Sequence, residues 1–397
     1  MPDPGAKQGP QGVQLTGYIQ AQAQLDQQSQ DQLAQGGAQL NQDLLLVRRG
    51  RIAITRAWDR AAVAFELDAN TVRGATVGLR RAEASLFWPR ATDDGALPTL
   101  ALTVGLTDIP FGHELIESSR ARLFDERTAA SLAFFPGEPD IGARLWGGVR
   151  QFRYQLAVSA GEPVNERAGQ NRPDPNAAKD VLGRVGVDTA PRDGITVAGG
   201  VSLLAGTGFH AGKSATKDGV EWRDTNQNGA IDTGELIAVP GTAATPSENF
   251  RRWALGADVE VGVRSRLGWT RVYGEVTIAS NLDRGLYVAD PITAGGDVRE
   301  LGAYAAAIQD LGSRAFVGLR FDVYDPNLDA FDDRKGTLIP TDARLLTLSP
   351  LVGVRLPWHA RVTVQYDHIT DNLARDRRGV PTDLKNDRIT ARLQVEL

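Results

Sequence analysis

Residues 104–142 read VGLTDIPFGHELIESSRARLFDERTAASLAFFPGEPDIG, and this stretch begins and ends in the alternating pattern of a β-strand. The pattern stops at Pro110, Phe111 and Gly112, because proline lacks a donor N–H and glycine tolerates unusual dihedral angles. The residues that follow carry charges of both signs. Long loops inside a compact domain are mostly functional or disordered. We therefore expect a functional loop over residues 108–139, entered from one strand and left through the next.

The composition excludes several classes of protein. The 397 residues include no cysteine, so neither disulfides nor thiolate metal sites hold the fold. The net charge of −5 argues against nucleic acid as a partner. No run approaches the ~20 apolar residues of a membrane helix, but a membrane barrel needs none, because only every second strand residue faces lipid. Residues 1–12 lack the apolar segment of a signal peptide, so we expect a mature chain with a flexible polar lead-in.

A period of two residues runs through most of the chain. In residues 13–25, for example, apolar side chains alternate with Gln20, Gln22 and Gln24 over the length that a membrane-crossing strand needs. This pattern predicts sixteen strands. We expect them at residues 13–25, around 52–54, and at 61–69, 82–88, 99–107, 140–148, 152–160, 181–188, 195–204, 253–261, 268–279, 299–309, 314–324, 345–356, 360–369 and 388–397.

The connections between the expected strands are mostly long and short in alternation, and the longest spans residues 205–250. Outer-membrane barrels show this asymmetry, with short periplasmic turns and long extracellular loops. A β-sandwich has no reason to produce it, and the chain has no repeat of the ~40–45 residues typical of a propeller. We predict an all-β protein, a single transmembrane antiparallel β-barrel over residues 13–397 in the bacterial outer membrane. An even number of strands places both termini in the periplasm.

The loop also carries a family resemblance, which rests on Gly105, Pro110-Phe111-Gly112-x-Glu114, Ser118-Ser119-Arg120, Glu126-Arg127, Pro136-Gly137 and Asp140-Ile141-Gly142. This run resembles the phosphate-selective porin (O/P) family of bacterial outer-membrane porins. The resemblance implies that the segment folds inward and narrows a pore, and that the chain forms a homotrimer. The partners would be outer-membrane lipid and small hydrophilic solutes or ions.

Charged strand residues are expected to face the lumen, because arginine on the lipid face costs ~2–4 kcal/mol at the bilayer midplane. This rule assigns Arg49, Arg51, Arg81, Arg144 and Arg320 to the lumen wall, where carboxylates accompany them. Every lysine falls in an expected loop or in the lead-in, so the chain lacks the central lysine cluster of phosphate-selective relatives. Strong selectivity needs rings of one sign. We predict that small hydrophilic solutes or ions diffuse passively through the barrel. If the channel is selective, we expect it to favour anions such as phosphate.

Five side chains of the loop are predicted to form the pore constriction, namely Glu114, Arg120, Arg122, Glu126 and Arg127. Two roles fit them. They could pair with one another and fix the loop to the barrel wall. Alternatively, the arginines could contact anions in transit, because guanidinium forks suit phosphate.

Two other functions fit a barrel. An enzyme would need a nucleophile beside a base, but the chain has four histidines and no Gly-x-Ser-x-Gly segment. We therefore predict that the protein is not an enzyme. A structural or adhesive barrel would keep a plugged lumen and bind a partner through long external loops. Single-channel conductance separates this alternative from a channel, because a plugged barrel gives no current steps.

The longest loop contains a calcium-binding pattern. Residues 224–235 read DTNQNGAIDTGE and match D-x-[DN]-x-[DN]-G-x5-E at every position. The expected ligands are Asp224, Asn226, Asn228, the carbonyl of Ala230, Asp232 and Glu235, because calcium binds six to eight oxygens. A polar surface turn that matches by chance is the alternative. We predict a structural Ca²⁺ ion that stabilises this external loop.

Overall fold

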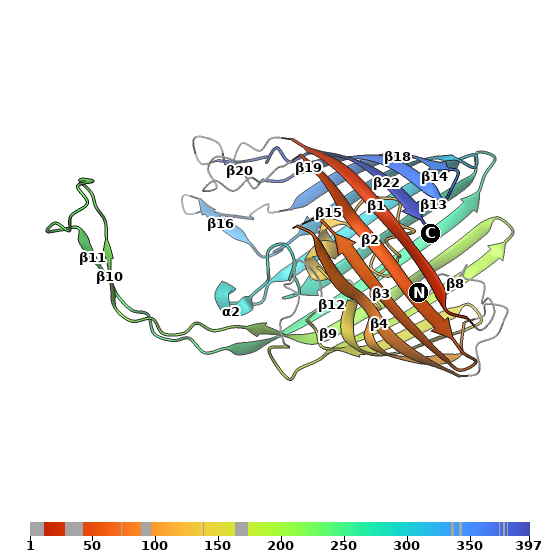
Figure 1. Ribbon diagram of the computed structural model, residues 1–397, viewed down its shortest axis with the longest axis horizontal. Coiled ribbons are helices and arrows are strands. Elements are labelled where there is room, and N and C mark those ends of the chain that lie inside the picture. Colours follow the sequence, from red (N-terminus) through yellow and green to blue (C-terminus); the bar gives the residue numbers. More distant parts are fainter. Residues whose placement is uncertain are drawn as a thin grey trace.

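The computed structural model describes residues 12–27, 43–72, 74–88, 97–137, 139–162, 174–334, 337–340, 344–372, 374–375, 378 and 380–397. The predicted flexible lead-in lies outside these residues, apart from Gly12. Within the described part, sixteen antiparallel strands form a closed barrel (Figure 1). The all-β class and the sixteen-stranded antiparallel barrel predicted from the sequence are therefore confirmed.

The barrel strands follow one another in chain order around the wall. They are β1 (Gln14–Asp26), β2 (Leu44–Ala57), β3 (Ala61–Asn70), β4 (Thr76–Trp88), β5 (Leu100–Asp108), β6 (Pro139–Val149), β7 (Phe152–Ser159), β8 (Asp180–Arg192), β9 (Ile195–His210), β12 (Glu248–Arg264), β13 (Trp269–Ser280), β14 (Arg299–Leu311), β15 (Ala315–Asp325), β18 (Leu345–Leu356), β19 (Ala360–Thr370) and β22 (Arg388–Glu396). The last strand closes the barrel on the first, with Tyr18 opposite Glu396 and Asp26 opposite Arg388.

The remaining elements lie in the connections. Three small hairpins are β10 (Gly219–Trp222) with β11 (Leu236–Val239), β16 (Phe331–Arg334) with β17 (Thr337–Pro340), and β20 (Ala374–Arg375) with β21 (Pro381–Thr382). The helices are α1 (Ala129–Phe134) and α2 (Pro291–Ala294). Neither helix in the described part of the chain has the length and apolar character needed to cross a membrane.

Alternation along each strand separates an apolar outside from a polar inside. On β1, Gln20, Gln22 and Gln24 are buried, whereas Leu15 and Ile19 are exposed. Other strands repeat this pattern, so that leucine, isoleucine and valine side chains are exposed around the outer wall while arginines and carboxylates are buried within. A wall with this distribution is the expected one for a barrel in lipid.

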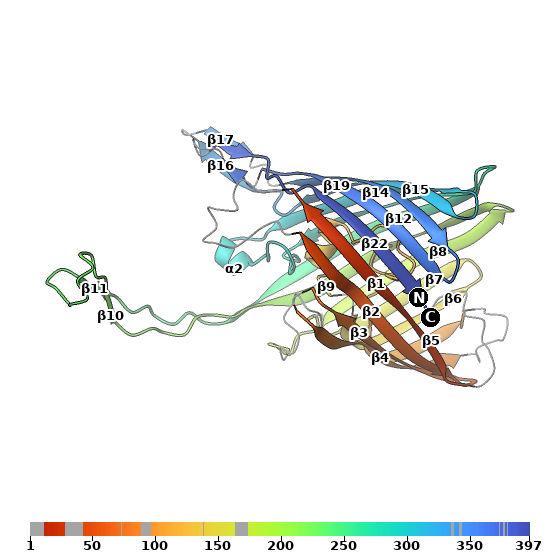
Figure 2. The ribbon, with the colours of Figure 1, turned by 45° about the horizontal axis from the view of Figure 1, so that its top comes forward.

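The long and short connections lie at opposite ends of the barrel. The three small hairpins and α2 share one end, and the ribbon that carries β10 and β11 projects far from it (Figures 1 and 2). The C-terminus and the start of β1 lie toward the other end (Figure 1). The projecting ribbon, residues 211–247, is called the arm below. It is shorter than the predicted loop 205–250, because residues 205–210 continue β9 in register with β12.

Residues 109–137 fold into the barrel and form its apolar core with the wall. Phe111, Leu115, Phe134 and Phe135 belong to a buried cluster with Leu182, Leu204 and Tyr324 of the wall. The ring of Phe134 meets that of Tyr324 edge-on, with centroids 5.6 Å apart. Helix α1 packs on β14 and β15. Its approach to β14 requires Gly302, because a Cβ at this position would overlap the Cβ of Ala130.

We expect Gly302→Ala to destabilise the folded barrel, because the new methyl group forces α1 away from β14. Overpacking of this kind typically costs ~1–3 kcal/mol. The thermal unfolding midpoint of the purified protein in detergent measures the effect. Gly296→Ala is the matched control, because a Cβ at position 296 meets no atom within 4 Å. Equal midpoints for the two variants would contradict the packing of α1 described here.

Candidate functional site

The candidate site is the interior loop, residues 109–137, together with the charged wall around it. The loop turns inward directly after β5, at the Pro110-Phe111-Gly112 segment that breaks the strand pattern. Glu275 of β13 captures the turn, since its Oε2 accepts the backbone N–H groups of His113 at 2.9 Å and Glu114 at 3.3 Å. Gly112 has φ +59°, and any Cβ there would overlap the Glu275 carboxylate. Glycine is therefore required where the loop enters the barrel.

Glu114 holds the loop together rather than facing open space. Its carboxylate accepts the backbone N–H of Thr128 at 2.9 Å and the Thr128 hydroxyl at 2.7 Å. Thr128 is in turn the N-cap residue of α1. The same carboxylate lies 3.2 Å from Nη1 of Arg320 on β15. Glu114 therefore joins the two halves of the loop and ties them to the wall.

Arg122 and Arg127 brace the loop from within. Nη2 of Arg122 donates to the carbonyls of Glu114 at 3.1 Å and Glu117 at 3.2 Å. Arg127 donates to the carbonyl of Phe135 at 2.9 Å. Both side chains are buried. These contacts hold the backbone of the loop in place from within the loop itself.

Arg120 ties the loop to the last strand. Its Nε lies 2.7 Å from Oε2 of Glu396 on β22. The Arg120 carbonyl accepts hydrogen bonds from Nη2 of Arg361 at 3.1 Å and from Nε2 of Gln394 at 3.0 Å. Because both the backbone and the side chain of Arg120 are bound, this part of the loop is fixed against the barrel wall.

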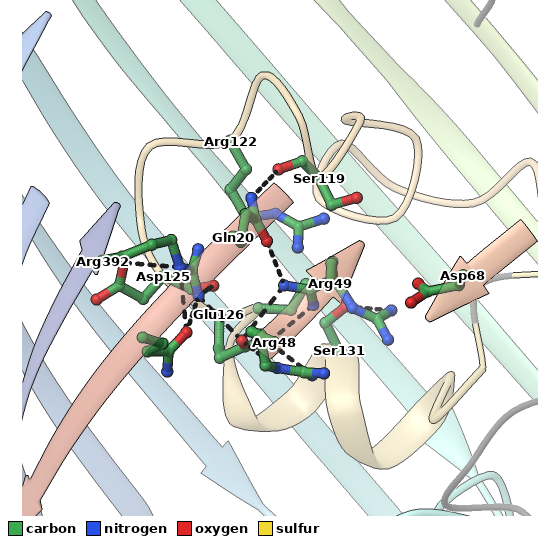
Figure 3. A network of polar contacts seen from close by, with 12 residues as sticks. Gln20, Arg48, Arg49, Asp68, Ser119, Arg122, Asp125, Glu126, Ser131 and Arg392 are labelled. Atoms are coloured by element: carbon green, nitrogen blue, oxygen red, sulfur yellow. Dashed lines mark hydrogen bonds and ion pairs between the residues drawn. The ribbon is translucent and has the colours of Figure 1, made fainter. Parts of the chain in front are cut away.

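Glu126 is the centre of the most heavily charged contact (Figure 3). Arg48 places Nε 2.7 Å from its Oε1, and Arg49 places Nη2 3.0 Å from its Oε2. Arg392 of β22 adds a third guanidinium, with Nη2 3.1 Å from Oε1. Asp125 lies beside Glu126, and its Oδ1 is 3.4 Å from Nε of Arg392. Three arginines therefore converge on two carboxylates of the loop.

Two β-bulges explain how consecutive arginines reach the same side. On β2, Gln20 pairs with Arg49 and Ala21 with Val47, so Arg48 is an extra residue in the ladder. On β4, Glu66 pairs with Arg81 and Leu67 with Leu79, so Arg80 is extra. A bulge inserts one residue into one strand of a pair and resets its alternation. The sequence carries a signal for this, because two adjacent arginines in a strand would otherwise place one in lipid.

The five arginines predicted for the lumen wall all lie on the inner side. Arg51 pairs with Asp68 at 2.7 Å, and Arg81 with Glu66 at 3.4 Å. Arg320 also pairs with Asp322 at 3.7 Å, and Arg49 contacts Glu126. Arg144 donates instead to the Asp108 carbonyl at 3.4 Å and to Gln155 at 3.5 Å. Alternation does not predict Arg48 or Arg80 on the inner wall, nor the contact made by Gln20, whose side-chain amide donates to the Ser119 carbonyl at 3.1 Å.

The predicted calcium ligands lie together at the tip of the arm, far from this site (Figure 1). Gly229 has φ +72° at the sharp bend, and the two Asp224 oxygens accept the backbone N–H groups of Asn228 and Gly229. The amide nitrogens of Asn226 and Asn228 both lie 2.7 Å from Oδ2 of Asp232. In the described residues, no three His, Cys, Asp or Glu side chains converge so as to hold a metal ion.

Hydrogen bonds lower the pKa of two carboxylates at this tip. Donation from the Asn226 and Asn228 amides lowers the pKa of Asp232 below its ordinary value. The pKa of Glu235 is lowered mainly by the hydrogen bond from Nε1 of Trp222, whose length is 3.1 Å. Both carboxylates are therefore negatively charged at neutral pH. This negative charge would favour a bound cation. The side-chain nitrogens of Asn226 and Asn228 point to Asp232, however, whereas a calcium ion would need their side-chain oxygens.

No family model matches the chain, and no curated protein matches it in sequence. Solved structures do match it in fold along nearly its whole length. The anion-selective porin from Comamonas acidovorans has a TM-score of 0.56 at 11% identity, with 97% of this chain and 99% of that chain covered. The outer-membrane channel DcaP of Acinetobacter baumannii has a TM-score of 0.54 at 9% identity, with 97% of each chain covered. OmpT, an outer-membrane protein of Vibrio cholerae in its trimer form, has a TM-score of 0.54 at 10% identity, with 97% and 99% covered.

At such low identity these likenesses concern the fold. The narrower resemblance to the phosphate-selective family stays a prediction. The likeness to the matched chains covers this barrel over nearly its whole length. The chain therefore has the fold of the outer-membrane porins.

Proposed function

We propose that the protein is an outer-membrane channel for the passive diffusion of small hydrophilic solutes and ions. One observation carries this proposal: a closed barrel with apolar side chains outside and charged side chains inside receives a loop that folds into its interior from one rim. The outer surface suits hydrocarbon, and the charged inner wall suits water. The long connections would face the cell exterior and both termini the periplasm.

The charge pattern supports diffusion of small solutes more than strict selection of phosphate. Charges of both signs lie together around the wall. Arg184 of β8 pairs with Asp258 of β12, and Arg51 of β2 pairs with Asp68 of β3. Both signs therefore act on a solute, whereas strong selectivity needs one sign. The arginines of the inner wall would still give anions favourable contacts, in keeping with the predicted anion case.

A homotrimer also belongs to this proposal. The resemblance seen in the sequence implies it, and one of the matched structures is a trimer form. The partners would be outer-membrane lipid on the outer wall and a second and third copy of the chain.

The arm provides a specific observation in favour of the adhesive alternative. Val220 pairs with Ala238 and Trp222 with Leu236, so these four side chains share one face of the β10–β11 ribbon. All four are exposed. An apolar face held away from the barrel fits a surface that binds a partner outside the cell.

Single-channel recording tests the proposed function. We expect stepwise current increments in planar bilayers, both from the full chain and from a variant in which an Asn-Gly turn replaces residues 214–244. This joint is feasible because Lys213 and Thr245 already pair through their backbones, at 3.2 Å. Conductance should be equal in the two proteins, because the arm projects away from the barrel (Figure 1). Absence of steps from both proteins would contradict a channel and favour the adhesive barrel.

Labelling of single cysteines tests the orientation, because the native chain has no thiol. On intact cells, Lys217→Cys in the arm should react with a membrane-impermeant maleimide. Asp59→Cys and His359→Cys, in short turns at the opposite end, should react only after the outer membrane is permeabilised. Reaction of either turn on intact cells would reverse the proposed orientation.

We also propose that residues 224–235 bind calcium. The full sequence match, the bend at Gly229 and the ionised Asp232 and Glu235 support this. If the side-chain amides of Asn226 and Asn228 were flipped, so that the oxygen and nitrogen of each exchanged places, their oxygens would face the ion. Two asparagines in place of acids lower the ligand charge, so we expect a Kd of ~10⁻⁴–10⁻³ M, as in extracellular modules.

Terbium luminescence measures calcium binding, because Trp222 contacts Glu235 and can sensitise a bound lanthanide. We expect terbium emission under tryptophan excitation and its displacement by calcium. Glu235→Gln should abolish both effects by removing the bidentate ligand. Glu221→Gln, an exposed carboxylate of the arm outside the pattern, should change neither. Equal emission from the Glu235 variant and the native chain would exclude the site.

A further inference from the structure

We infer that Arg48, Arg49 and Arg392 form a binding site for carboxylate groups of small solutes, and that the Glu126 side chain of the interior loop occupies this site when no solute is present. The inference rests on the proposed channel function, since a solute must reach the interior.

The geometry is that of a built oxyanion site. Arg48 binds Glu126 through two nitrogens, with Nε 2.7 Å from Oε1 and Nη2 3.2 Å from Oε2. Arg49 also uses two, with Nη2 3.0 Å from Oε2 and Nη1 3.4 Å from Oε1. Two parallel N–H donations to one carboxylate are the arrangement by which arginine recognises planar oxyanions. Both oxygens of Glu126 are therefore held from two sides.

Arg49 and Arg392 are held by side chains other than Glu126. Arg49 donates from Nη1 to Oε1 of Gln20 at 3.2 Å. Arg392 donates to Oε1 of Gln22, from Nε at 3.1 Å and from Nη2 at 2.8 Å. Glutamine side chains on β1 thus orient two of the three guanidinium groups. A site whose donors are already oriented loses less entropy when it binds a ligand.

The charges leave room for an added anion. Three guanidinium groups face two carboxylates, Glu126 and Asp125, and Asp125 contacts only Arg392 among the three. Removal of Glu126 would take away the carboxylate that Arg48, Arg49 and Arg392 share. Buried charge without a partner is strongly unfavourable. A carboxylate from a solute is the natural replacement, because it reproduces the planar pair of oxygens that the arginines already bind.

Glu126 is more exposed than Arg49 and Arg392, which hold it. The Glu126 side chain is 22% exposed, whereas those of Arg49 and Arg392 are 6% and 3% exposed. A solute would therefore approach Glu126 first and then take its place. Chloride, which is a single atom, would not satisfy two guanidinium forks at once.

Rescue of a truncated variant tests the inference. In Glu126→Ala, the thermal unfolding midpoint should fall and then rise in a saturable way as sodium acetate replaces sodium chloride at constant ionic strength. Ligands that bind only the folded state act in this way. Glu117→Ala is the matched control, because Glu117 is a loop carboxylate paired with another arginine, Arg122, at 3.7 Å. Its midpoint should respond equally to the two salts.

A second variant covers the case in which Glu126→Ala does not fold. Glu126→Gln keeps the size of the side chain but removes its charge, and it should shift the reversal potential in a salt gradient toward anions. Equal responses to acetate and chloride in Glu126→Ala, or an unchanged reversal potential in Glu126→Gln, would overturn the inferred site. The unfolding measurement requires no conduction, so acetate rescue in a protein without current steps would refute the channel and leave the site standing.

Discussion

The wall of this protein is a single layer of backbone, and the rest of the structure depends on that constraint. Each strand has one apolar face and one polar face, so a polar side chain has only one direction available. Charged groups therefore collect inside the barrel. Once inside, most of them pair, and the interior becomes a second core made of ion pairs.

The inner loop is held by both kinds of core. Its aromatic residues pack against β12 to β15, where Phe111 and Phe134 are almost fully buried. Its charged residues face β22, β1 and β2, where Glu126 meets three arginines. A loop fixed by apolar contacts on one side and by charge on the other has little freedom to move as a whole. Local exchange of a single side chain is a smaller change than displacement of the loop.

The sequence predicts the parts of this structure that follow from alternation. The strands and their inward arginines are expected, because one residue in two must avoid lipid, whereas the inward fold of the loop after Asp108 is expected only from the family resemblance. The sequence does not predict which residues the inward side chains contact. Glu114 looks like a pore residue in the sequence, yet its carboxylate binds Thr128, the N-cap residue of α1, and Arg320, which lies 206 positions away in the chain. Alternation also fails where a bulge resets it, so Arg48 and Arg80 went unnoticed as inner-wall residues.

At each bulge, the loss of one residue would change the charge of the barrel interior. On β2, odd-numbered residues such as Leu45 face outward before the bulge, whereas odd-numbered residues such as Arg51 face inward after it. Loss of the extra residue would restore a regular ladder and remove one inner cation without turning either end of the strand inside out. Loss of a residue elsewhere in the same strand would invert everything on one side of it. Length variation at these two positions is thus an evolutionary route to a different lumen that leaves the outer surface intact.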